Sequence, residues 1–417
     1  MNFTAIKSYK YVAWGLAGLF FMMHYVIRVA PQEMIDLLRA DFNLNMSDIT
    51  AIQSAFFLSY ILMQVPAGLL IDRFPPHRIL QAAVATVLLS SILFYQAHTF
   101  GWLILSRVLL GIGSAFAFSG SVKMATLWFP RQYLGILTSL TQVLGMIGAA
   151  SQSLIDNVVD VMPWRLAVEY YVFALLTMWI LMLCVWRENP DVERVHHTRS
   201  ADLRVVLADF KEAMQNKQTW LVSLYAGFIF APTLVFGESI GLKYLDIAND
   251  TVTVHQGTIL ITILFIGFSV GGILQGGLSD YLGRRRPSLS ISAIGALICF
   301  SVFLYADLNY VHLCVLIFFY GLFDSGLVIS YALAGEINPR RISGAGIAFA
   351  NMMSVLVGTV VLRATGFGLE YLQASWQFTE SGAYRATFVF LPICILVALY
   401  SVRHIQESFC RSVDESL

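Results

Sequence analysis

The feature that most constrains this chain is a succession of long apolar segments that runs almost from one end to the other. Each is about 20 residues long or more, which is enough for a helix to cross the hydrocarbon core of a bilayer. Of the 417 residues, 58% are hydrophobic and 12% are charged, whereas a soluble domain has roughly 25% charged residues. Because so few charges cannot cover a water-exposed surface, the sequence predicts an all-α integral membrane protein.

The polar breaks between these segments predict twelve transmembrane helices. They cover residues 11–38, 48–72, 78–98, 101–127, 133–157, 165–187, 219–243, 255–280, 287–307, 310–336, 342–370 and 384–405. The first apolar run follows Lys7 and Lys10 but has no small-residue cleavage site, so it is expected to be a membrane helix and not a secretory signal. The one long polar segment predicts three parts: an N-terminal six-helix bundle at 1–187, a cytoplasmic linker at 188–218 and a C-terminal six-helix bundle at 219–417.

Basic residues gather in the loops on one side of the predicted membrane. Cytoplasmic loops carry an excess of Lys and Arg, so this distribution places both termini in the cytoplasm. The net charge is zero, and no nucleic-acid partner is expected. No nucleotide-binding loop, metal-ligand spacing or catalytic cluster is present in the sequence, so we expect no enzyme activity, cofactor or metal site.

A short polar stretch occurs twice, about half a chain length apart. Both copies lie between two apolar segments and share a Gly, an Asp four residues later and an Arg ten residues later: Gly68, Asp72, Arg78 and Gly276, Asp280, Arg286. A period that divides the chain in two indicates a duplicated unit. In a membrane protein it predicts two similar bundles related by a pseudo-two-fold axis.

These stretches resemble the loop motif GxxxDRxGRR of the Major Facilitator Superfamily. The first copy has Gly68, Asp72, Arg73 and Arg78, with Pro75 where the family usually has Gly. The second copy has Gly276, Asp280, Gly283 and Arg284, with Tyr281 at the basic position. A second family motif, an Arg followed by spaced glycines, is matched by Arg107, Gly111 and Gly113.

The resemblance implies two bundles that rock around a central site, with the repeated loops as gates. Asp72 is then expected near Ser343, and Asp280 near Tyr133. Arg107 is given a structural or coupling role. The helix-5 Gly-Pro motif of many drug exporters is absent from this sequence, which counts against drug efflux.

Three cations and a histidine within the predicted spans are candidate substrate-binding groups. They are Arg28, with His24 one turn before it, Lys123 and Arg363. A charge inside the membrane is costly and usually faces a cavity or a partner. Arg offers a planar fork to a carboxylate and Lys a point charge. The alternatives are structural ion pairs, side chains that reach the interface, and a hydrogen-bonded core histidine at His24. Gln142 and Tyr331 are weaker polar candidates for the same cavity.

Two acids lie at depths suitable for proton coupling. Asp324 is in the predicted tenth helix, and Glu238 is in the seventh. Burial raises the pKa of a carboxyl group and a nearby cation lowers it. The alternatives are an ion pair of Asp324 with Arg28 or Arg363, and a rim position for Glu238.

The stretch Tyr25–Pro31, together with Lys123–Pro130, is similar to a bacterial branch of the family that imports amino acids, nucleosides or carboxylate siderophores. We therefore expect a proton-coupled, monomeric importer in the bacterial inner membrane, in contact with lipid, protons and a small substrate. The cations favour a polycarboxylate, such as a carboxylate siderophore. The alternatives are an amino-acid or nucleoside importer of the same fold and a membrane sensor that does not transport.

Overall fold

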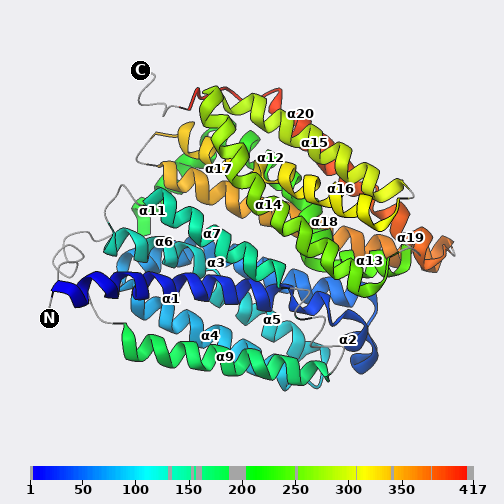
Figure 1. The fold of residues 1–417 in the computed structure, drawn as a ribbon, viewed down its shortest axis with the longest axis horizontal. Helices are drawn as coiled ribbons and strands as arrows, with labels where there is room; N and C mark the ends of the chain where they lie inside the picture. Colours follow the sequence, from blue (N-terminus) through cyan, green and yellow to red (C-terminus); the bar gives the residue numbers. More distant parts are fainter. Residues whose placement is uncertain are drawn as a thin grey trace. The chain divides into compact units, whose positions relative to one another are not determined.

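The computed structural model describes residues 3–129, 134–151, 155, 162–186, 203–248, 252–306, 308–339, 342–376 and 378–410. Within these ranges the regular structure is entirely helical (Figure 1). Eleven segments there are long and apolar enough to cross a membrane, and a shorter apolar helix covers Leu140–Ala150. The predicted all-α membrane fold is confirmed, and these segments follow the order of the twelve predicted spans.

Contacts divide the chain into two compact units. The first unit contains Met1–Phe42 and Ala55–Val206, and the second contains Asn43–Ser54 and Leu207–Leu417. The helix α3 contributes its beginning to the second unit and the rest to the first. The domain boundaries predicted from the sequence stay predictions, and residues 187–202, which hold much of the predicted linker, lie outside the described residues.

The first unit is built from helices. Its elements are α1 (Phe3–Val29), the 3₁₀ turn η1 (Ala30–Gln32), α2 (Ile35–Phe42), α3 (Met46–Arg73), α4 (Pro76–Tyr95), α5 (Phe100–Ser114), α6 (Ala117–Trp128), α7 (Leu134–Ala150) and α9 (Trp164–Val185). The predicted first span, 11–38, is wrong at its end. Because Pro31 has no N–H to donate to the preceding turn, α1 stops at Val29 and Ile35–Phe42 forms a separate helix.

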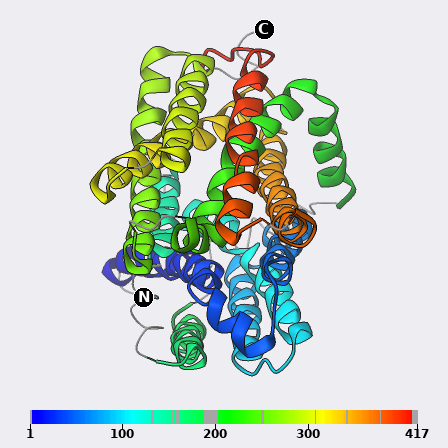
Figure 2. The same cartoon turned by 90° about the vertical axis from the view of Figure 1, so that its right-hand side faces the viewer.

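The second unit repeats the helical plan with two irregular spans (Figure 2). Its elements are α11 (Leu203–Gln215, across the boundary), α12 (Lys217–Pro232), the π-helix η3 (Thr233–Ile240), α13 (Gly241–Ala248), α14 (Val254–Leu282), α15 (Arg285–Tyr305), α16 (Tyr310–Asp324), α17 (Gly326–Glu336), α18 (Ser343–Trp376), α19 (Glu380–Thr387) and α20 (Phe390–Val402). The predicted seventh span widens into a π turn directly after Pro232, and the predicted tenth is interrupted at Ser325.

Two glycines of α5 allow neighbouring helices to come unusually close. A Cβ at Gly111 would overlap the Ser59 hydroxyl and the Phe56 carbonyl of α3, and a Cβ at Gly113 would lie 2.8 Å from the Ala83 carbonyl of α4. The motif that the sequence singled out as Arg107, Gly111 and Gly113 is therefore a packing device. Its glycines bring α3 and α4 against α5.

A cluster of charged side chains joins the helix ends around the second copy of the repeated stretch. Gly283 ends α14 with φ of 60°, a conformation that glycine adopts at little cost. Arg285 then binds Asp280 at 2.6 Å and Glu336 at 2.6 Å. The motif residue Arg284 does not take part in these ion pairs, and its guanidinium carbon lies 6.0 Å from the ring centre of Phe409.

The segment after α20 completes the same cluster. Glu407 accepts hydrogen bonds from the backbone N–H groups of Arg285 (2.7 Å) and Arg286 (3.0 Å). A carboxylate at a helix N-terminus satisfies unpaired donors and complements the helix dipole. Ser408 donates to Glu336 at 2.6 Å. In the first copy of the motif, Arg78 is exposed, and the side chains of Asp72 and Arg73 lie outside the described residues.

A second cluster holds the end of α2 in the first unit. Asp41 accepts hydrogen bonds from the Trp164 indole (2.8 Å) and the Arg165 guanidinium (2.8 Å). Arg165 also donates to the Ala97 carbonyl at 3.1 Å. The bond from Trp164, followed by that from Arg165, lowers the pKa of the Asp41 carboxyl group.

We expect Gly111→Ala to lower the stability of the purified protein by about 1–3 kcal/mol, because an extra carbon in a packed interior forces backbone shifts. Gly15→Ala is the matched control, since no atom beyond its own helix lies within 4 Å of the added carbon. Thermal unfolding in detergent measures both. An unchanged Tm for Gly111→Ala would show that α3 does not need this close approach.

The Asp41 cluster predicts a pH effect of defined sign. Since the folded-state pKa of Asp41 is lowered, the carboxylate stabilises the fold above its unfolded pKa of about 3.9 and loses this contribution as the pH falls through the folded value. The Tm difference between wild type and Asp41→Asn should therefore be present at pH 6 and shrink below about pH 4. The exposed Asp36 provides a control, as Asp36→Asn should show little difference at either pH. A difference that grows toward low pH would contradict the assignment.

Candidate functional site

Arg28 is a buried cation surrounded by aromatic rings in the first unit. It lies in the last turn of α1 and is 5% exposed. Its guanidinium carbon is 4.9 Å from the ring centre of Tyr25, 5.0 Å from that of Phe57 and 5.5 Å from that of Phe56. The negative face of an aromatic ring attracts a cation, and more strongly away from water. The rings of α1 and α3 thus offset part of the cost of burying this charge.

His24 lies beside Arg28, as its spacing predicted. Its Nδ1 is 2.7 Å from the Phe21 carbonyl oxygen, and the bond has Nδ1 as donor. The His24 ring packs against Tyr25 with ring centres 4.6 Å apart, and Tyr25 also contacts Arg28. His24 Nε2 has no hydrogen-bond partner among the described residues. The structure therefore brings the two residues together around one tyrosine.

Arg107 reaches the same region from α5. It is 2% exposed, and it donates from Nη1 to the Ile27 carbonyl at 3.1 Å and from Nη2 to the Arg28 carbonyl at 2.9 Å. Its guanidinium carbon is 5.2 Å from the centre of the Phe56 ring, which also contacts Arg28. Arg107 is thus bound to the end of α1 and shares an aromatic support with Arg28.

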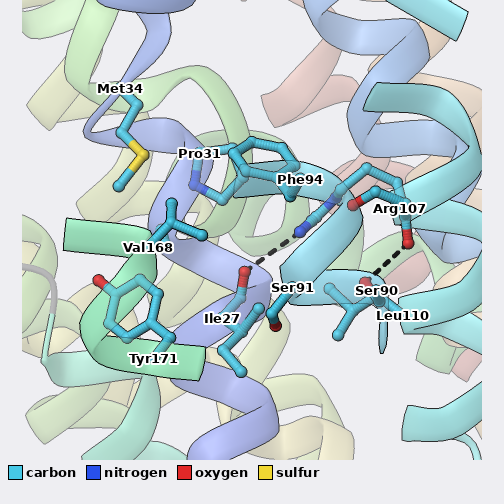
Figure 3. A pocket seen from close by; sticks show the side chains of 12 residues that line it. Ile27, Pro31, Met34, Ser90, Ser91, Phe94, Arg107, Leu110, Val168 and Tyr171 are labelled. Atoms are coloured by element: carbon cyan, nitrogen blue, oxygen red, sulfur yellow. Dashed lines mark hydrogen bonds between the residues drawn. The ribbon is translucent and has the colours of Figure 1, made fainter. Parts of the chain in front are cut away.

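A small cavity of about 20 Å³, partly open to the surroundings, lies next to this contact. Figure 3 shows Arg107, Pro31 and Ile27 on one part of its wall. Its other polar lining comes from Ser90 and Ser106, which bond to each other, together with Ser91 and Tyr171. Of the residues singled out from the sequence, Arg107 lines this cavity, while Arg28 and His24 do not.

Lys123 and Gln142 stand on the two helices that pack against α1. Lys123 is on α6 and Gln142 on α7, both half-buried, and α1 contacts α6 and α7 along its length. Three mutually packed helices of one unit therefore carry Arg28, Lys123 and Gln142.

Asp324 is a fully buried carboxyl group in the second unit, at the end of α16. Its Oδ2 accepts a hydrogen bond from Thr233 Oγ1 at 2.6 Å, and that hydroxyl lies 2.8 Å from the Tyr320 hydroxyl. Asp324 Oδ1 has no hydrogen-bond partner within the described residues. Thr233 begins the π-helix η3, which also contains Glu238, 3% exposed. Glu238 is thus a buried residue of the second unit.

Arg363 and Tyr331 have partners of their own. Arg363, on α18, donates to the Ser47 carbonyl at 2.6 Å and to Thr50 Oγ1 at 3.0 Å. Tyr331, on α17, has its hydroxyl 2.9 Å from Ser354 Oγ. The predicted alternative of an ion pair between Arg363 and Asp324 is not formed among the described residues. Because the helix is interrupted at Ser325, Asp324 and Tyr331 do not lie on one continuous helix face.

Sequence reasoning missed the groups that surround these charges. The rings of Tyr25, Phe56 and Phe57 surround Arg28. The Thr233 hydroxyl binds Asp324 and lies within hydrogen-bond distance of the Tyr320 hydroxyl. Aromatic residues are common in membrane spans, so nothing in the sequence separates these rings from lipid-facing ones. Pro232 could have indicated that the helix becomes irregular at Thr233, since a proline disturbs the hydrogen bonding of a helix.

Comparison with known proteins agrees with the helical fold. A "Probable galactarate/D-glucarate transporter GudP" of Pseudomonas putida is 23% identical over 83% of each chain. A "Probable sulfoacetate transporter SauU" of Cupriavidus necator is 24% identical over 68% of each. The crystal structure of a mutant of the nucleoside transporter NupG superposes with a TM-score of 0.77, at 12% identity, over 95% of this chain and 99% of that chain.

The sequence profile of the Major Facilitator Superfamily matches residues 13–248 and 234–408, which together cover nearly all of the chain. The protein is therefore a multi-pass membrane transporter, not an enzyme, and it belongs to the Major Facilitator Superfamily.

Proposed function

We propose that this transporter imports a small organic anion, with a polycarboxylate as the favoured substrate, by alternating access across a bacterial inner membrane. The observation that carries the proposal is Arg28, a buried guanidinium on α1 in contact with three aromatic rings. Charged groups within membrane spans usually mark substrate or ion pathways. A guanidinium offers parallel N–H groups that match the two oxygens of a carboxylate.

A second cation fits the same substrate class. Lys123 is on α6, which packs directly against α1. Ring contacts of Phe21 with Phe118 and of Tyr9 with Trp128 place Lys123 beside the N-terminal half of α1, whereas Arg28 lies in the last turn of that helix. We therefore propose Lys123, with Gln142 on α7, as a further polar contact along the substrate path and not as a second ligand of the carboxylate that Arg28 binds.

The names of the relatives support the same class of substrate. Galactarate and D-glucarate are sugar acids with two carboxylates, and sulfoacetate carries a carboxylate and a sulfonate. All are small dianions. Sugar diacids are accordingly the first compounds to test, and carboxylate siderophores remain larger candidates of the same chemistry.

We further propose that Asp324 carries the coupling proton. It is completely buried and is held by the Thr233 hydroxyl, and no cation binds it among the described residues. A carboxyl group in such surroundings is more stable when protonated, because burial penalises its charged form. Protonation from one side of the membrane and release to the other would couple transport to the proton gradient.

Arg28→Ala should weaken galactarate uptake about 10–100-fold, because a hydrogen bond to a charged group contributes about 1.5–3 kcal/mol. The measurement is initial uptake of labelled galactarate into membrane vesicles, corrected for the amount of inserted protein. Arg39→Ala is the control, since Arg39 lies on the short helix α2 and pairs with the exposed Asp36. Wild-type kinetics in Arg28→Ala would remove Arg28 from the site.

Asp324→Asn should abolish uphill accumulation but retain exchange of labelled for unlabelled substrate, since the amide cannot carry a proton. Accumulation in proteoliposomes with and without an uncoupler, and in sodium-free buffer, gives the test. If Asp324→Asn accumulates substrate as the wild type does, or if accumulation survives the uncoupler and needs sodium, the proton role of Asp324 is wrong.

A further inference from the structure

The end of α1 has a defect that any structure inside a membrane must repair. In a continuous helix the Ile27 carbonyl would accept a hydrogen bond from the N–H of residue 31, but Pro31 has none. Ile27 is 8% exposed and lines the small cavity described above, so its carbonyl has little access to solvent donors. A proline within a membrane span is tolerated only where a neighbouring group satisfies the freed carbonyl.

Arg107 supplies the missing donors from another helix. Its two terminal nitrogens donate to consecutive carbonyls, to that of Ile27 at 3.1 Å (Figure 3) and to that of Arg28 at 2.9 Å. The C-terminal end of a helix carries a partial negative charge that favours a cation. Among the described residues no carboxylate binds Arg107, so its charge is offset by these two carbonyls and the Phe56 ring.

The two hydrogen bonds from Arg107 to the end of α1, here called the clamp, act on Arg28, the residue that carries the proposed function. One of the two carbonyls belongs to Arg28 itself. The Phe56 ring contacts the guanidinium groups of both Arg28 and Arg107. The backbone of Phe56 packs directly against Gly111 of α5, where a side chain would leave no room for it. The main chain and the ring support of Arg28 are therefore both set by α5.

We propose that Arg107 is a positioning residue for transport: its fork holds the broken end of α1 and thereby fixes Arg28 in its binding geometry. The identity of the positioned group rests on the proposed function. The small cavity beside Arg107, Ile27 and Pro31 shows that packing around this joint is incomplete, so the two hydrogen bonds contribute to holding it. Lysine cannot replace the fork, because one ammonium does not reproduce the fixed spacing of two donors.

The proposal predicts a specific rescue between two positions on different helices. Arg107→Met removes both donors and should raise the KM for galactarate about tenfold or more, with Vmax and membrane insertion much less affected. Pro31→Ala returns an N–H to the Ile27 carbonyl. Arg107→Met should also lower the Tm. In the double variant, at least half of the increase in KM and half of the decrease in Tm should therefore be reversed.

Hydrogen–deuterium exchange of residues 27–34 in detergent is a readout that needs no substrate. Exchange there should rise in Arg107→Met and fall back in the double variant, and Arg39→Met, the control, should match the wild type in exchange and KM. If wild type does not transport galactarate but the exchange pattern holds, the substrate proposal fails and the clamp stands.

Two results would overturn the clamp. In one, folded Arg107→Met keeps both the wild-type KM and wild-type exchange. In the other, the effects of Pro31→Ala and Arg107→Met simply add, with no rescue in the double variant. Rescue of Tm and exchange with an unchanged KM would limit Arg107 to a structural role and overturn its role in positioning.

Discussion

The bond between the Arg107 fork and the end of α1 explains much of the architecture of the first unit. A membrane interior offers no water to satisfy a carbonyl that a proline has freed, so a donor must come from another helix. A guanidinium can reach the Ile27 and Arg28 carbonyls only if α5 lies close to α1. The glycines at 111 and 113 bring α3 and α4 against α5 at the same level. One short motif thus sets three helix contacts.

The two units share a helical plan but handle buried charge by different means. In the first unit, aromatic faces and backbone carbonyls offset the cations Arg28 and Arg107. In the second, hydroxyls hold Asp324 next to a π turn. The first environment stabilises a positive charge in an apolar region, and the second gives a carboxyl group a hydroxyl donor. Our assignment of the anion to one unit and the proton to the other follows from this chemical difference.

The sequence predicted the spans and their order because a bilayer imposes one length on every apolar helix. It did not predict the interruptions at Pro31 and Ser325 or the π turn that follows Pro232, since hydropathy averages over single residues. Depth alone identified Arg28, His24 and Asp324 as buried. Their partners could not be predicted, because Phe56 and Thr233 come from other helices and are ordinary residues for a membrane span. The ion pairs of Arg285 with Asp280 and Glu336 were likewise not predicted, because Glu336 lies about 50 residues further along the chain at the end of another helix.

The cluster at the second motif shows what duplication of a bundle does not provide. Asp280 and Arg285 belong to the repeated stretch, but Glu407 and Ser408 come from the segment after the last helix. Glu407 satisfies two backbone donors at the start of α15, where Arg284 provides no side-chain cap. Without Glu407 those two backbone donors would depend on solvent. The segment 403–410 is therefore an integral part of the second unit, and its contacts hold the ends of α14, α15 and α17 in one arrangement.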